Sequence, residues 1–136
     1  MSFATESPAL IVDSIMTRHV MVVSPDTTIK AVRALFDAHR FHHVPVEERD
    51  KLVGIVSDRD VLTALSPQVD RPAATAHDLA TLDKKVHQIM NRGIYTATPL
   101  MLIAEAGALM LAQSISSLPV VDESGKCVGI VTSRDF

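Results

Sequence analysis

The sequence is poor in cysteine and in aromatic residues. Among its 136 residues there is one cysteine, Cys127, there is no tryptophan, and aromatic residues make up 4% of the chain. A single cysteine excludes an intrachain disulfide and is typical of a reducing compartment, so we expect a cytoplasmic location. Because aromatic rings are scarce, we expect a core of aliphatic and methionine side chains.

Long hydrophobic runs and clustered charge are also missing. No apolar run approaches the roughly 20 residues that cross a bilayer, and residues 1–8 lack the basic start and apolar centre of a signal peptide. The net charge is −3 and the basic residues are scattered, whereas a nucleic-acid surface needs clustered positive charge. We therefore expect neither a membrane nor a nucleic acid as a partner.

The residue patterns of common active sites are absent as well. The chain has only five glycines and no glycine-rich phosphate loop. No Ser-His-Asp order and no metal-ligand spacing stand out. We therefore expect the protein not to be an enzyme and to carry neither a metal ion nor a prosthetic group.

What the chain does contain is one pattern that occurs twice. Pro119 follows Pro45 by 74 residues (119 minus 45), within matching Pro-Val pairs. Gly129 follows Gly54 by 75 residues, because the turn at 122–126 has one residue more than its counterpart. A nearly constant spacing over a whole pattern is typical of an internal duplication.

Each copy predicts a helix, a strand, a helix, two strands and a helix start. In the first copy we expect a helix at 9–16, a strand at 20–23, a helix from Ser24-Pro25, strands at 44–46 and 52–56, and a helix at 57–65. This order gives a mixed α/β (α+β) fold, with an N-terminal tail at 1–8, repeats at 9–66 and 83–136, and a linker at 67–82.

The two repeats are expected to depend on each other. Because roughly 60 residues give only a marginal core, we expect the copies to pack sheet to sheet as a pseudo-symmetric pair with two clefts between them. A short helix is expected at 73–82. The second copy stops at Phe136, so we expect it to lack the closing helix.

A hydroxyl residue ends the last strand of each copy, and an aspartate follows three residues later. The two pairs are Ser57 with Asp60 and Thr132 with Asp135. This spacing fits a capping box, in which the two residues satisfy each other's backbone N–H groups. It also fits a helix start whose free N–H groups hold an anion. The residues alone leave both interpretations open.

The histidines gather in one place, with His39, His42 and His43 close together. Such a cluster at a helix end can act through the helix dipole. The spacing could also suit a metal ion, but no cysteine or carboxylate clearly completes a ligand set. The second copy has Ser116 and Ser117 at the positions of His42 and His43, so the two copies are expected to differ here.

Taken together and in order, these motifs resemble the CBS domain, named for cystathionine β-synthase. The matching segments are Ile15-Met16-Thr17, Val23-Ser24-Pro25, His43-Val44-Pro45-Val46, Gly54-Ile55-Val56-Ser57 with Asp60, Ile89-Met90-Asn91, Thr98-Pro99, Leu118-Pro119-Val120-Val121-Asp122, and Gly129 with Thr132 and Asp135. The resemblance implies a tandem pair, a Bateman module, which binds adenosine-containing ligands, forms homodimers and regulates another protein.

The resemblance implies AMP, ADP or ATP as the regulatory ligand, with S-adenosylmethionine or NAD as alternatives. Because the repeats fill the chain, we expect the module to act on a separate partner protein. A module for protein interaction or dimerisation, with empty clefts, is a second hypothesis, and the apolar run Leu100-Met101-Leu102 favours it.

The resemblance also assigns site residues. Asp60 and Asp135 would accept hydrogen bonds from ribose hydroxyls, and basic residues just before the Pro-Val strand would contact phosphate. If His42 and His43 do so, affinity should rise as the pH falls toward 6. The residues expected to bind ligand are Thr17, Met21, His42, His43, Val44, Ser57, Arg59, Asp60, Asn91, Tyr95, Ser117, Leu118, Thr132, Arg134 and Asp135.

Some of these residues have ordinary structural alternatives. Arg59 and Arg134 could be solvated surface residues instead of anion clamps, and Met21 and Tyr95 could pack in strands instead of lining an adenine slot. Because the second copy lacks a closing helix, we expect the Asp135 site to be the weaker of the two.

Overall fold

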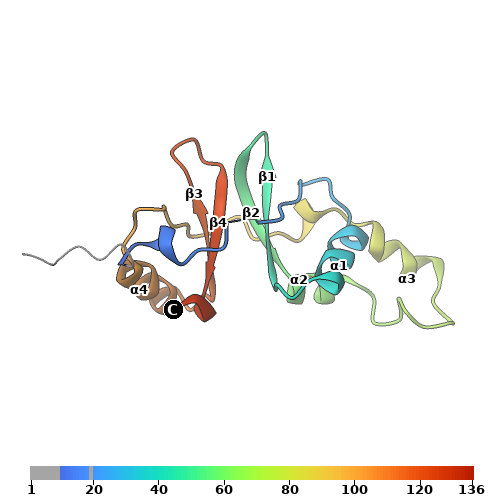
Figure 1. Cartoon of the computed structure of the whole chain (residues 1–136). Coiled ribbons are helices and arrows are strands. Elements are labelled where there is room, and N and C mark those ends of the chain that lie inside the picture. The colour runs from blue at the N-terminus through green and yellow to red at the C-terminus, as the bar shows by residue number, and fades with distance from the viewer. Residues whose placement is uncertain (1–9, 19) are drawn as a thin grey trace, which may run out of the picture. The chain divides into compact units, whose positions relative to one another are not determined.

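The computed structural model describes residues 10–18 and 20–136 (Figure 1). The expected tail at 1–8 lies outside the described residues. The chain forms two compact units, one of Met21–Ile94 and one of Met1–Val20 with Tyr95–Phe136. Each unit combines helices with a two-stranded antiparallel sheet, as expected for a mixed α/β fold. Within the described part of the chain, no helix is long and apolar enough to cross a membrane.

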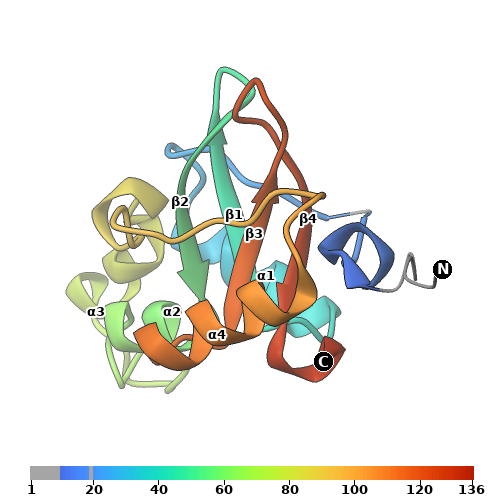
Figure 2. The same cartoon turned by 90° about the vertical axis from the view of Figure 1, so that its left-hand side faces the viewer.

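In the unit Met21–Ile94, strands β1 (His43–Glu48) and β2 (Lys51–Ser57) form a hairpin. The turn residues Arg49 and Asp50 have φ values of 54° and 62°, the left-handed conformation that a tight two-residue hairpin requires. Figures 1 and 2 show two helices next to each other at one end of this hairpin. They are α1 (Ile29–Ala38) and α2 (Asp58–Ala64).

The start of α1 differs from the prediction. Ser24 and Pro25 do not begin the helix, because the Ser24 N–H donates to Thr27 Oγ1 at 3.0 Å and closes a turn there. Thr28 is the cap instead, and its Oγ1 accepts from the N–H of Ala31 at 3.2 Å. The strand expected at 20–23 is also wrong. Only Val23 pairs, with β1, through a single parallel bridge to Val46.

The second unit repeats this plan around β3 (Ser117–Val121) and β4 (Cys127–Thr132), which pair antiparallel. Helix α4 (Ile103–Gln113) packs against β3. The chain then ends in a single 3-10 turn, Ser133–Asp135, where the first unit has α2.

The helix expected at 9–16 is not formed. Among the described residues of this range, Val12–Ser14 form a 3-10 turn, and their counterpart in the other unit is Val86–Gln88. The N–H groups of Val12 and Val86 are taken by carbonyls outside these turns, at 2.8 Å each. The linker does contain the expected helix, as α3 (Ala76–Ala80) followed by a 3-10 turn, Thr81–Asp83.

Each unit takes its hairpin from one sequence repeat and its short leading segment from the other. Met90 packs against β2 at Gly54. A Cβ atom added to Gly54 would be 2.8 Å from the Met90 sulfur. Met16 lies under β4 in the same way, with 2.8 Å between its sulfur and a Cβ added to Gly129. The two buried cores are aliphatic and methionine-containing, as the composition predicts.

Candidate functional site

The candidate site is built around the pair Ser57 and Asp60 at the start of α2. The Ser57 N–H donates to Asp60 Oδ2 at 2.9 Å, and the Asp60 N–H donates to Ser57 Oγ at 3.0 Å. The capping box is therefore formed. It uses one carboxylate oxygen of Asp60 and leaves Oδ1 outside the box, so capping and ligand binding do not exclude each other at this residue.

The corresponding pair in the second unit is less regular. The Thr132 N–H donates to Asp135 Oδ2 at 2.7 Å, and the Thr132 hydroxyl lies 3.4 Å from the same oxygen. This aspartate sits in the 3-10 turn Ser133–Asp135, with no α-helix behind it in this chain.

A contact between His42 and Asp58 lies directly beside the first pair. His42 Nδ1 is 2.7 Å from Asp58 Oδ2, and the backbone N–H of Asp58 donates to the His42 carbonyl at 3.0 Å. The hydrogen bond with His42 is the main reason why the pKa of the Asp58 carboxyl is lowered. Asp58 is not among the ligand residues expected from the sequence. The hairpin register could have found it, because His43 pairs with Ser57 and so the neighbours 42 and 58 meet.

The other two histidines have different surroundings. His43 begins β1, and burial lowers its pKa, with the charges of Asp58 and Asp60 opposing that effect. His39 follows α1, and its ring stacks on Phe41 with 5.0 Å between centroids. Within residues 10–18 and 20–136, no group of three or more histidine, cysteine or acidic side chains is placed to hold a metal ion.

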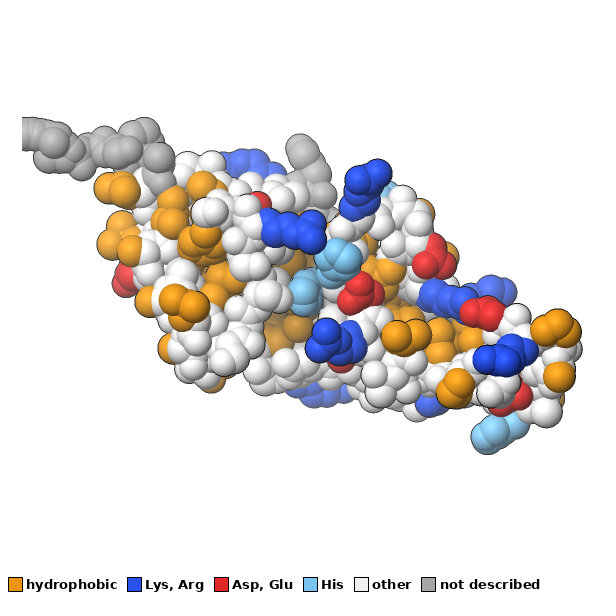
Figure 3. Space-filling model, turned by 90° about the horizontal axis from the view of Figure 1, so that it is seen from below, with side chains coloured by type: hydrophobic (Ala, Val, Ile, Leu, Met, Phe, Trp, Pro, Cys, Tyr) orange, Lys and Arg blue, Asp and Glu red, His pale blue; other side chains and the backbone are white. Residues whose placement is uncertain are grey.

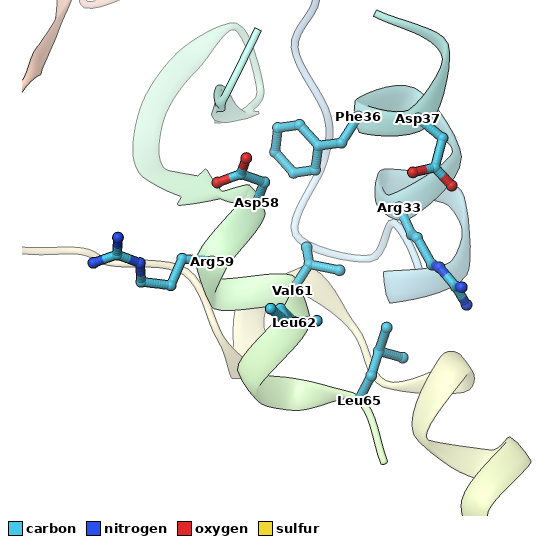
Figure 4. A pocket seen from close by; sticks show the side chains of 8 residues that line it. All are labelled: Arg33, Phe36, Asp37, Asp58, Arg59, Val61, Leu62 and Leu65. Atoms are coloured by element: carbon cyan, nitrogen blue, oxygen red, sulfur yellow. The ribbon is translucent and has the colours of Figure 1, made fainter. Parts of the chain in front are cut away.

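A pocket of about 470 Å³ lies between α1 and α2. Figure 4 shows the Phe36 ring between the two helices and Arg59 pointing away from α1. The other lining residues are Arg33, Asp37, Asp58, Val61, Leu62 and Leu65. Of the expected ligand residues, only Arg59 lines this pocket, so it is distinct from the group around Asp60.

The backbone pairs two of the expected residues with strands from the opposite repeat. Asn91 exchanges two hydrogen bonds with Ile55 of β2, at 2.9 and 3.0 Å, and Thr17 does the same with Ile130 of β4. From the sequence, each of them was expected to belong with its own repeat. The indication in the sequence is the glycine one residue before each partner, because a glycine inside a strand often marks the close approach of another backbone.

The remaining expected residues divide between the two units. The unit with Asn91 contains Met21, His42, His43, Val44, Ser57, Arg59 and Asp60, and the unit with Thr17 contains Tyr95, Ser117, Leu118, Thr132, Arg134 and Asp135. Met21 and Tyr95 are partly exposed, at 40% and 44%. Val44 and Leu118 are fully buried core residues, so only their backbone atoms could meet a ligand.

Comparisons with known proteins agree with a chain built from two repeats. The sequence model of the CBS domain family matches residues 12–67 and 86–136. A CBS domain-containing protein of Dictyostelium discoideum is 30% identical over 132 residues, which cover 93% of this chain and 88% of that protein.

Two solved structures carry adenosine compounds. CBSX2 in complex with AMP is 28% identical, with a TM-score of 0.75, and the match covers 93% of this chain and 92% of that one. The CBS domain pair of protein MJ0100, in complex with 5′-methylthioadenosine and S-adenosyl-L-methionine, is 28% identical, with a TM-score of 0.74 and coverage of 92% and 90%. The two repeats, the matching glycine contacts and these likenesses agree, and the chain belongs to the CBS domain family, as a pair of CBS domains that forms a Bateman module.

Proposed function

We propose that this protein binds an adenosine nucleotide at a site built around Ser57 and Asp60. AMP is the first candidate. CBS pairs are regulatory ligand-binding modules, and the ligands in the two related structures share an adenosine group. The observation that carries the proposal is the fixed carboxylate of Asp60, whose Oδ2 is held by the Ser57 N–H at 2.9 Å. Oδ1 can then accept a ribose hydroxyl, and hydrogen bonds to charged groups contribute about 1.5–3 kcal/mol.

The second site, around Thr132 and Asp135, is proposed to bind more weakly. The residues at the positions of His42 and His43 are Ser116 and Ser117, neither of which can carry a positive charge. ADP and ATP are the next candidates for the first site. S-adenosylmethionine and NAD are alternatives because both contain adenosine.

A thermal melt with each candidate ligand tests this function. A ligand present at 100 times its dissociation constant stabilises a one-site protein by about 2.7 kcal/mol, a shift of several degrees for a domain of this size. We expect AMP to raise the melting temperature, and Asp60→Ala to remove more of the shift than Asp135→Ala. No shift with millimolar AMP, ADP, ATP, S-adenosylmethionine or NAD would leave the interaction module as the better account.

We also propose that the protein forms a homodimer through the outer face of α4. In α1 the corresponding outer positions carry Lys30 and Asp37, whereas α4 has Ala104 and Leu111 there. Leu111 is 85% exposed. Figure 3 shows hydrophobic side chains on the surface of the unit that carries α4. An exposed apolar helix face is normally covered, and a second copy offers the same apolar surface in return.

The output of the module is proposed to be regulatory and not catalytic, exerted on a separate protein partner. We propose a cytoplasmic location, in line with one cysteine in the chain. The Cys127 thiol is buried in β4 as a free cysteine.

A further inference from the structure

Two contacts join His42 to Asp58, one through the backbone and one through the side chains. The His42 carbonyl accepts from the N–H of Asp58 at 3.0 Å, and the His42 ring Nδ1 lies 2.7 Å from Asp58 Oδ2. The two side chains are about half exposed, at 56% and 46%, so a solute can reach the pair. The pair also adjoins the capping box, because Asp58 follows Ser57 directly.

The second repeat shows that the fold does not need this charged pair. Ser116 and Ser133 occupy the corresponding positions (116 is 42 plus 74, and 133 is 58 plus 75). The same backbone bond is present, with the Ser133 N–H donating to the Ser116 carbonyl at 2.9 Å. The junction between strand and helix therefore forms without a carboxylate and an imidazole, and their presence in the first repeat calls for another explanation.

Asp58 occupies the Nδ1 side of His42, where it would compete with a ligand phosphate for that nitrogen. The ring nitrogen that faces Asp58 can donate one hydrogen bond in its protonated state, and the carboxylate oxygen already lies at that position. A phosphate that approaches Nδ1 must displace Asp58, and a phosphate at either ring nitrogen meets the negative charge of Asp58 nearby. Other charged or titratable groups near the pair include His43, Asp60 and Arg59, and Arg33 and Asp37 line the same pocket as Asp58.

We propose that Asp58 is an intramolecular competitor for His42, which weakens the binding of phosphorylated ligands at the Ser57–Asp60 site and leaves the binding of the uncharged nucleoside unchanged. This inference rests on the proposed function, because it needs an adenosine ligand whose phosphate reaches His42. It makes Asp58 a residue that sets the preference of the site for ligand charge.

The test is a calorimetric titration of the full chain with AMP and with adenosine, for wild type and Asp58→Asn. Asparagine keeps the shape of the side chain and removes its charge. We expect the AMP dissociation constant to fall about twofold to fivefold, the size of effect typical of half-exposed charge pairs, and that of adenosine to stay the same. Asp37→Asn is the matched control, because Asp37 lines the pocket next to Asp58 but has no histidine partner in the described structure, and it should change neither constant.

The outcomes separate this inference from the proposed function. If adenosine and AMP bind to wild type but Asp58→Asn binds AMP no more tightly, the competitor role is wrong and the nucleotide site stands. If AMP binds only to Asp58→Asn, the competitor role is supported in its strongest form. If neither protein binds AMP or adenosine, both the proposed function and the inference fail. The ¹⁵N chemical shift of His42 Nδ1 should change in Asp58→Asn and not in Asp37→Asn, which checks the contact without any ligand.

Discussion

At the scale of single residues, the account depends on one carboxylate that serves two purposes. Asp60 completes the capping box through Oδ2, with the Ser57 N–H at 2.9 Å, and offers Oδ1 to a ligand. The chain contains a second complete box, Thr75 with Asp78, at the start of α3. That box lies outside the candidate site, so the chain itself provides a control that separates capping from ligand binding.

Replacing Ser57 by alanine should therefore destabilise the fold without abolishing nucleotide binding. Loss of an N-cap hydroxyl costs about 0.5–2 kcal/mol, while the carboxylate of Asp60 remains. Urea unfolding measures the first effect and an AMP titration of the folded protein measures the second. Thr75→Ala should lower stability in the same way and leave AMP affinity at its wild-type value. Abolished AMP binding in both variants would mean that stability alone explains the effect.

The partly buried side chain of His43 predicts a dependence of stability on pH. Burial lowers the pKa of His43 below its ordinary value of 6.5, so the unfolded chain binds the proton more readily than the folded chain does. Stability should therefore fall as the pH drops from about 7 through 6.5 toward the folded-state pKa. His43→Gln should show a smaller loss between pH 7 and pH 5 in urea unfolding. An unchanged slope in this variant would contradict the assignment to His43.

The same burial changes what is expected of ligand binding near pH 6. Because the pKa of His43 is lowered, this side chain stays neutral to a lower pH than an exposed histidine. The expected gain in anion affinity as the pH falls toward 6 is therefore smaller from His43 than an ordinary histidine would give.

At the scale of elements, the main finding is the exchange of short segments between repeats. Met16 and Thr17 lie against β4, and Met90 and Asn91 lie against β2. The Asn91 carbonyl oxygen would lie 3.0 Å from a Cβ atom added at Gly54. The Thr17 carbonyl oxygen would lie 2.8 Å from a Cβ atom added at Gly129. These are backbone atoms, which cannot swing aside as a side chain can.

Gly129→Ala should for this reason be strongly destabilising. The added Cβ would lie 2.8 Å from both the Thr17 carbonyl oxygen and the Met16 sulfur, and overpacking of this kind costs about 1–3 kcal/mol. Urea unfolding of the variant gives the number. Gly93→Ala is the matched control, because the nearest atom to its added Cβ is 4.0 Å away. Equal stabilities of the two variants would show that the close approach does not constrain Gly129.

The sequence could predict the strands and the need for space at Gly54, but not what fills that space. The hairpins follow from β-branched runs and local turn residues, so they are visible within a few residues of sequence. The start of α1 was misplaced because Ser24-Pro25 and Thr28 are both good start signals, and the Ser24–Thr27 turn decides between them. The partner of Gly54 comes from 36 residues later (90 minus 54), a distance at which local propensity has no influence.

At the scale of the whole molecule, each compact unit contains residues of both sequence repeats. Neither repeat can therefore complete its core from its own sequence alone, which agrees with the marginal core expected of roughly 60 residues. The two helices at corresponding positions also differ in surface character, since α4 carries Leu111 where α1 carries Asp37. This difference is the basis for proposing that α4 is covered by a second copy.

Leu111→Glu should convert the proposed dimer into a monomer. A charge within the proposed apolar interface would have to be desolvated in both copies without a partner of opposite charge. Sedimentation velocity over a range of concentrations measures the result. Leu79→Glu introduces the same charge at another exposed leucine, on α3, and should leave the dimer intact. A wild-type protein that stays monomeric at high concentration would contradict the proposal directly.

The central claim is that Asp60 accepts a hydrogen bond from the ribose of an adenosine ligand. Calorimetric titration with AMP tests it most directly. The proteins to compare are wild type, Asp60→Ala and Asp78→Ala, since Asp60 and Asp78 both sit in complete capping boxes. The account predicts that wild type and Asp78→Ala bind AMP with the same affinity and that folded Asp60→Ala binds at least about tenfold more weakly, the loss of one hydrogen bond to a charged group. AMP binding that is equal in all three folded proteins would contradict it.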